Sequence, residues 1–146
     1  TVYTRDNWAD QFAHWPNVKK FPDLPYSGEK RQDEPFHWGT GPYAGVLGLT
    51  FKPKAIFMLG FDLGPLEKNK INNMYTGSEG YTYIKRPVDP SYWIYQFHKL
   101  MGYSDPDTRW IVVNHDRWEM PKEWSQHGNV FQETYDGMAK FIAGKI

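Results

Sequence analysis

Apolar positions along the chain follow two patterns that alternate. The first is an unbroken apolar run, at residues 55–61 and 110–113, which is typical of a strand covered on both faces. The second is an apolar stripe at helical spacing, at Trp93, Phe97 and Leu100. This alternation of strands and helices predicts an α/β protein with a mainly parallel sheet.

Turn residues set the boundaries of the predicted elements. Residues 39–42, Gly-Thr-Gly-Pro, predict a helix start, because proline suits the first turn, where its missing N–H would have no partner. Pro53 ends this helix. The apolar strand of residues 55–61 follows, and we expect it at the centre of the sheet. Asp89 as N-cap and Pro90 at the first position start the next helix.

Shorter elements are predicted at both ends of the chain. Residues 2–4 and 18–21 are predicted strands on either side of a short helix. Residues 130–131 form another predicted strand. The last helix is predicted over residues 135–142, with three apolar side chains facing the core: Met138, Phe141 and Ile142.

A chain of 146 residues suits one domain and is too short for two of ordinary size. We therefore predict a single, small, three-layer Rossmann-like α/β domain over residues 1–146. Because a strand-like segment directly follows Thr1, a second interpretation stays open, in which these residues are the C-terminal half of a larger Rossmann-like fold.

Composition narrows the classes of protein and site. The 17 Lys and Arg residues balance the 17 Asp and Glu residues, so no net field attracts nucleic acid or an anionic membrane. The absence of cysteine excludes disulfides, cysteine-bound zinc and a thiol nucleophile. No apolar run approaches the roughly 20 residues that span a bilayer, and no leader is evident. The default expectation is a soluble cytoplasmic protein.

The glycine turn at Gly39, Thr40 and Gly41 is a candidate ligand site. A helix start presents free backbone N–H groups, which suit a phosphate or another anion. Binding of NAD is disfavoured, because the segment before Gly39 is not an apolar strand and Pro42 removes one N–H. The alternative is a tight turn that needs glycine for backbone reasons alone.

Polar side chains follow two predicted strands. Asp62 comes directly after the first, and Asn114 and His115 come after the next. Ligands of parallel sheets gather where strands end, so these residues are expected to meet at one edge. There Asp62 is a candidate to orient a hydroxyl or act as a base, and His115 is a candidate acid or base. The alternative is that Asp62 caps a loop.

The long segment after Asp62 is a predicted binding loop. Asn72, Asn73 and Tyr75 offer uncharged hydrogen-bonding groups, which suit a sugar or nucleoside. Asparagine is also an ordinary turn former, so a purely structural role stays open. No metal site is predicted, because no further histidine is spaced to join His115.

The segments 39–47 and 56–63 resemble part of the Rossmann-like bacterial sialyltransferases, and of related bacterial and phage proteins of unknown function. Segments 72–75 and 88–93 are similar to the phage-type relatives. The resemblance implies that Thr40 and Gly41 lie near a nucleotide-sugar donor, with Asp62 at the rim of the active site. The glycine-rich donor loop of the family has no counterpart here.

Two function hypotheses follow, and they belong to different classes. The first is a glycosyltransferase-like domain, active or degenerate, that binds a nucleotide or nucleotide-sugar. The second is a non-enzymatic, phage-type accessory or binding protein on the same fold, as a homo-oligomer. Residues 63–90 lack the histidine that the resembled enzymes use as base, so Tyr81 or Tyr83 would have to replace it. A third hypothesis, a hydrolase, requires the side chains of Asp62 and His115 to lie within hydrogen-bonding reach of each other or of one bound water.

Overall fold

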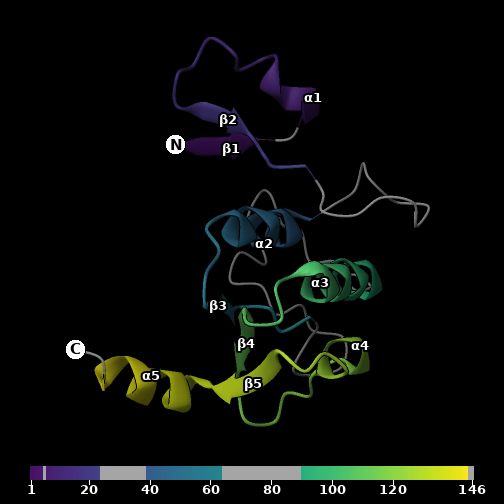
Figure 1. The fold of residues 1–146 in the computed structure, drawn as a ribbon, viewed down its shortest axis with the longest axis vertical. Helices are drawn as coiled ribbons and strands as arrows, with labels where there is room; N and C mark the ends of the chain where they lie inside the picture. Colours follow the sequence, from purple (N-terminus) through teal and green to yellow (C-terminus); the bar gives the residue numbers. More distant parts are fainter. Residues whose placement is uncertain (5, 24–38, 64–89, 145–146) are drawn as a thin grey trace, which may run out of the picture.

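Three parallel strands form the main sheet of this protein (Figure 1). The computed structural model describes residues 1–4, 6–23, 39–63 and 90–144. The strands are β3 (Ala55–Leu59), β4 (Arg109–Asn114) and β5 (Val130–Thr134), in the order β3-β4-β5. The predicted parallel sheet is therefore confirmed.

The central strand of the sheet is β4, and β3 lies at an edge of the described sheet. The expectation that residues 55–61 form the centre is wrong. The burial of the two strands agrees with this order: Trp110, Val112 and Val113 of β4 are fully buried, whereas Leu59 at the end of β3 is exposed. An unbroken apolar run indicates that both faces of a strand are covered. It does not show whether the strand has a hydrogen-bonded neighbour on each side.

Register places the ends of the three strands at one edge. Leu59 of β3 pairs with Val113, and Asn114 of β4 pairs with Thr134 of β5. We call this edge, where β3, β4 and β5 end at Leu59, Asn114 and Thr134, the carboxyl edge. In parallel sheets it is the place where ligands bind.

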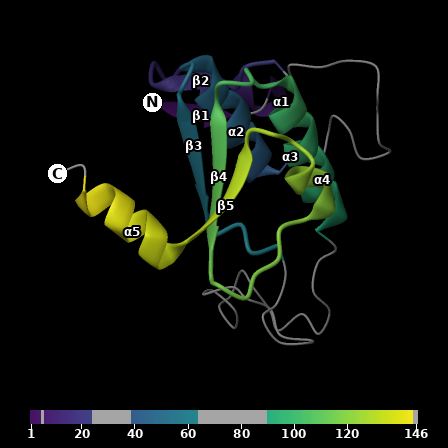
Figure 2. The same cartoon turned by 60° about the horizontal axis from the view of Figure 1, so that its bottom comes forward.

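Helices α2 (Thr40–Thr50), α3 (Ser91–Tyr103) and α4 (Lys122–Ser125) cover one face of the sheet (Figure 2). The helices predicted after Gly39 and after Asp89 are confirmed. The N-cap of α3 is Pro90, Asp89 lies outside the described residues, and α3 continues through Gly102 to Tyr103. Short connections join α2 to β3 and α3 to β4, so both helices run back along their strands. Both therefore begin at the carboxyl edge.

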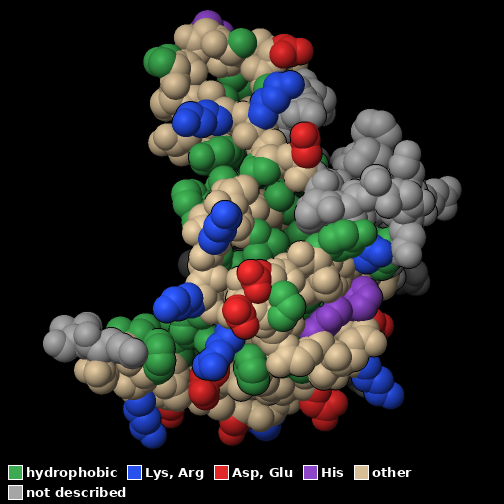
Figure 3. Space-filling view, in the orientation of Figure 1, with side chains coloured by type: hydrophobic (Ala, Val, Ile, Leu, Met, Phe, Trp, Pro, Cys, Tyr) green, Lys and Arg blue, Asp and Glu red, His purple; other side chains and the backbone are tan. Residues whose placement is uncertain are grey.

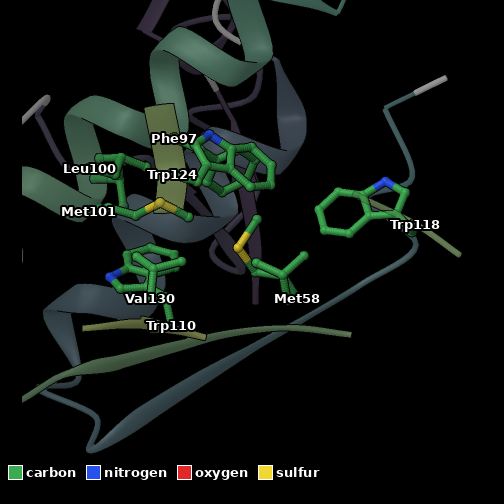
Figure 4. Packing of buried hydrophobic residues seen from close by; sticks show 10 residues of the cluster. Met58, Phe97, Leu100, Met101, Trp110, Trp118, Trp124 and Val130 are labelled. Carbon is green, nitrogen blue, oxygen red and sulfur yellow. The ribbon is translucent and has the colours of Figure 1, made fainter. Parts of the chain in front are cut away.

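The core lies between these helices and the sheet (Figure 4). Alternation along β4 points Trp110 and Val112 to the helices, where Phe97 packs against Trp110 with ring centroids 6.3 Å apart. The Trp110 Nε1–H donates to Ser104 Oγ at 2.9 Å, so the buried indole keeps its hydrogen bond. The cluster also contains Val46, Met58, Leu100, Met101, Trp118, Trp124 and Val130.

Helix α5 (Tyr135–Ala143) directly follows β5 and contacts β4 as well as β5. The helix extends away from the end of β5 (Figure 1), and in its last turn Phe141 contacts Phe57 of β3, with ring centroids 5.8 Å apart. The helix is confirmed, but the prediction that Phe141 and Ile142 face the core is wrong, since both are exposed, and Met138 is only partly buried. Helical spacing shows which residues share a face and does not show whether that face has a partner.

The described chain is thus a mixed α/β fold with parallel sheets, and its three-layer arrangement stays a prediction. At the N-terminus, β1 (Val2–Thr4) pairs in parallel with β2 (Val18–Lys20), and α1 (Asp6–Ala9) lies between them in sequence, as predicted. Phe21 after β2 stacks on Tyr43 of α2, with ring centroids 4.8 Å apart. None of the helices in the described ranges is long and apolar enough to cross a membrane.

Two histidines join α3 to the turn before β5. His127 Nε2 lies 2.9 Å from His98 Nδ1, which also lies 3.0 Å from the backbone oxygen of Glu123. Figure 3 shows histidine side chains gathered on the surface in this region. These contacts fix α3 beside the turn before β5.

We expect the fold to lose stability as the pH falls below about 6.5. Burial, together with the charge of neighbouring His98, lowers the pKa of His127 from its ordinary value of 6.5. Between the lowered pKa and 6.5, the unfolded chain binds more protons than the folded chain, so the free energy of unfolding decreases with falling pH in this window and not above it. Urea unfolding across the window measures the slope, which His127→Gln should reduce. Equal slopes for variant and wild type would contradict the expectation.

Candidate functional site

The carboxyl edge brings together residues that are far apart in sequence. Asp62 follows β3 and Asn114 ends β4, on neighbouring strands. Trp118 connects them, because its Nε1–H donates to the backbone oxygen of Asp62 at 2.9 Å and its backbone N–H donates to the oxygen of His115 at 3.0 Å. The ends of the two strands thus lie at one edge, and the meeting of the Asp62, Asn114 and His115 side chains there stays a prediction. His115 makes no direct hydrogen bond to the described Asp62 side chain. The hydrolase hypothesis, which a water shared by the two side chains would also satisfy, stays a prediction.

The backbone around Asp62 bends sharply. Gly60 has φ +78° and Leu63 has φ +60°, both in the left-handed region. Glycine adopts this region freely, whereas a residue such as Leu63 adopts it rarely. Conformations of this kind concentrate at functional sites, where surrounding contacts hold them in place. Asp62 therefore lies in a closely specified turn.

The start of α2 lies at the same edge and has no side-chain cap. Its N-cap is Gly39, and its first turn contains no acidic residue. The Gly39 N–H donates to Gln96 Oε1 at 3.2 Å, and Pro42 has no N–H to offer. The N–H groups of Thr40 and Gly41 have no hydrogen-bond acceptor among the described residues. As far as the described residues go, these backbone donors are unpaired, and donors at a helix start suit an anion.

The two glycines of the turn also have a packing role. A Cβ on Gly39 would lie 2.6 Å from Trp93 Nε1, and a Cβ on Gly41 would lie 2.6 Å from Phe61 Cε1. Phe61 in turn packs edge-on against Phe97, with ring centroids 5.0 Å apart. The start of α2, the residue before Asp62 and helix α3 are therefore in direct contact. Glycine at both positions allows this close approach.

Gln96 of α3 is a site residue that the sequence patterns did not single out. It is 1% exposed, and while its Oε1 accepts from Gly39, its Nε2 has no hydrogen-bond partner. The available signal was its position, since Gln96 lies three residues after Trp93 and four before Leu100, on the apolar stripe. A polar side chain on such a stripe is buried, and burial without a partner is costly.

Ideal rises per residue place Gln96 and Asn114 at a similar height along the sheet. Ser104 and Trp110 are hydrogen-bonded, which fixes α3 beside β4 at their other end. From Ser104 back to Gln96, α3 rises about 12 Å at ~1.5 Å per residue. From Trp110 to Asn114, β4 rises about 13 Å at ~3.3 Å per residue. Because Asn114 alternates with Val112 and Trp110, its side chain leaves β4 on the side that α3 covers.

The side chains of Asn114 and His115 each accept one hydrogen bond from a backbone N–H group. Asn114 Oδ1 accepts from the backbone N–H of His115 at 2.9 Å, and His115 Nδ1 accepts from the backbone N–H of Arg117 at 3.2 Å. The opposite nitrogens, Asn114 Nδ2 and His115 Nε2, are buried and have no partner. Asn114 is 1% exposed as a whole.

The remaining predicted site residues are not placed. Asn72, Asn73 and Tyr75 lie outside the described residues, as do Tyr81 and Tyr83. Within the described ranges, no three histidine, aspartate or glutamate side chains form a group that could hold a metal ion. The prediction that the site binds no metal stays a prediction.

Comparisons with known protein families, with curated protein sequences and with solved structures found no match. The geometry of the carboxyl edge is therefore the feature that bears on function.

Proposed function

We propose that this domain binds a nucleotide or nucleotide-sugar at the carboxyl edge of a Rossmann-like fold, as a glycosyltransferase-like domain. The observation that carries the proposal is the start of α2, which lacks both a side-chain cap and an acidic residue. The helix dipole and free N–H groups at such an end favour negative charge. The phosphates of a nucleotide supply that charge.

Each part of the ligand then has a matching group. Thr40 and Gly41 offer backbone N–H groups to phosphate oxygens, next to the Gln96 carboxamide. Asp62, in its turn after β3, is suited to accept a hydrogen bond from a ribose or sugar hydroxyl. Asn114 and His115 offer nitrogen donors to the rest of the ligand.

Binding without turnover is the second candidate, as a non-enzymatic, oligomeric accessory protein on the same fold. Glycosyl transfer needs a base near the acceptor hydroxyl. Asp62 and His115 are not hydrogen-bonded as an acid–base pair. Transfer of sugar from a bound donor separates the two candidates, because only the enzyme releases free nucleotide.

Thermal unfolding with CMP, UDP and their sugars tests the proposal. At a concentration about a hundredfold above Kd, a ligand of the folded state should raise Tm by roughly 5–10 °C for a chain of this size. No rise with any of these ligands at millimolar concentration would contradict it.

A variant at Thr40 tests the position of the phosphates. Thr40 is exposed at the first position of α2, so Thr40→Asp adds a carboxylate at the positive helix end. We expect the unliganded variant to be more stable by about 0.3–1 kcal/mol and the ligand-induced rise in Tm to be lost through repulsion. Thr40→Asn, which adds a side chain of the same shape without charge, is the control and should keep the rise.

A further inference from the structure

Three buried side-chain nitrogens at the carboxyl edge lack hydrogen-bond partners. They are Gln96 Nε2, Asn114 Nδ2 and His115 Nε2, and they are the buried unpaired side-chain atoms found among the described residues. No buried side-chain oxygen in those ranges is unpaired. Buried polar groups in folded proteins nearly always have a partner, so three in one region point to a missing one.

The two carboxamides must present N–H groups. Gln96 Oε1 accepts from the Gly39 N–H, and Asn114 Oδ1 accepts from the His115 N–H. A backbone N–H requires an acceptor, so these bonds fix which atom of each amide is oxygen. The unpaired atoms are therefore NH₂ groups, which donate and do not accept.

The imidazole of His115 is fixed in the same way. Its Nδ1 accepts from the Arg117 N–H at 3.2 Å, which requires a lone pair on Nδ1. The proton of the neutral ring then lies on Nε2. The buried, unpaired Nε2 is therefore a third donor.

We infer that Gln96, Asn114 and His115 recognise oxygen acceptors of the bound ligand, and that neutral His115 acts there as a hydrogen-bond donor and not as a base. This inference deepens the proposed function and rests on it. Three uncharged donors suit phosphoryl or carbonyl oxygens. They do not suit a metal ion, because N–H groups offer it no lone pair.

Two substitutions of His115 separate donation by Nε2 from the structural role of Nδ1. In His115→Asn, the side-chain oxygen reaches the position of Nδ1 and can accept from Arg117, but no group replaces Nε2. In His115→Gln, the longer amide reaches the position of Nε2 and restores a donor. We expect CMP to bind roughly tenfold more weakly to the Asn variant, and the Gln variant to recover most of the affinity.

Calorimetric titration with CMP, cytidine and pyrophosphate identifies the acceptor. Weaker binding of CMP and pyrophosphate to the Asn variant supports recognition of phosphoryl oxygens, and weaker binding of CMP and cytidine supports recognition of the base carbonyl. If the wild type binds CMP and the Asn variant binds it equally well, the inference is wrong while the proposed function stands. If the wild type binds none of the three probes and neither UDP nor a nucleotide-sugar raises its Tm, the proposed function fails, and this inference fails with it.

A measurement on the wild type covers the case in which a variant does not fold. Long-range ¹H–¹⁵N NMR shows which ring nitrogen of His115 carries the proton at neutral pH. A proton on Nε2 supports the inference. A proton on Nδ1 overturns it, whichever ligand the protein binds.

Discussion

Replacing Trp110 with alanine is expected to lower the free energy of unfolding by about 3–5 kcal/mol, the largest effect of any single change considered for this chain. Trp110 is fully buried on the central strand and packs against Phe97. Its removal leaves a cavity beneath α3 and takes a hydrogen-bond donor from Ser104. Urea or guanidinium unfolding, followed by circular dichroism, measures the loss.

Two further variants make this expectation specific. Trp110→Phe retains most of the apolar volume and should cost less than the alanine change, so it gives a value even if Trp110→Ala does not fold. Trp8→Ala removes the same side chain where it is 47% exposed and should cost well under half as much. Equal losses for Trp8→Ala and Trp110→Ala would contradict the described core.

The second large effect is expected at Gly41, where Gly41→Ala should lower the free energy of unfolding by about 1–3 kcal/mol. The new methyl group would lie 2.6 Å from the ring of Phe61, which is held against Phe97 and has little room to move. The change also displaces the start of α2 from the residue before Asp62. Loss of stability should therefore be accompanied by weaker binding of any ligand at the carboxyl edge.

Gly48→Ala in the same helix is the matched control. A Cβ on Gly48 would meet Ile56 Cδ1 at 3.7 Å, an ordinary contact. Alanine stabilises a helix interior by roughly 0.5–1 kcal/mol relative to glycine, so the sign of the effect should reverse. If Gly41→Ala stabilised the protein as much as Gly48→Ala, the packing described at the start of α2 would be wrong.

Much of the secondary structure could be predicted, because local patterns determine it. Pro42 and the small residues after it predict α2, and the stripe at Phe97 and Leu100 predicts α3. Neighbour relations were harder to predict, since no local pattern reveals them. The strand in the apolar run, β3, lies at an edge of the described sheet, and the apolar stripe of α5 leaves Phe141 exposed.

The candidate site was predicted in part. Asp62, Asn114 and His115 could be predicted as candidate site residues, because they follow or end parallel strands, which end at a common edge. Gln96 was not found, because its role depends on a hydrogen bond to Gly39, a residue distant in sequence. The protonation of His115 also depends on a contact, with Arg117, that spacing alone does not show.

The central claim is that the unpaired side-chain N–H groups at the carboxyl edge donate hydrogen bonds to a ligand when it binds. Side-chain ¹H–¹⁵N NMR during titration with CMP or a CMP-sugar tests it most directly. The NH₂ signals of Gln96 and Asn114 should move on binding. That of Asn129, which already donates to the backbone oxygen of Thr108 near the other end of β4, should stay in place. Saturation that leaves the Gln96 and Asn114 signals unmoved would contradict the claim.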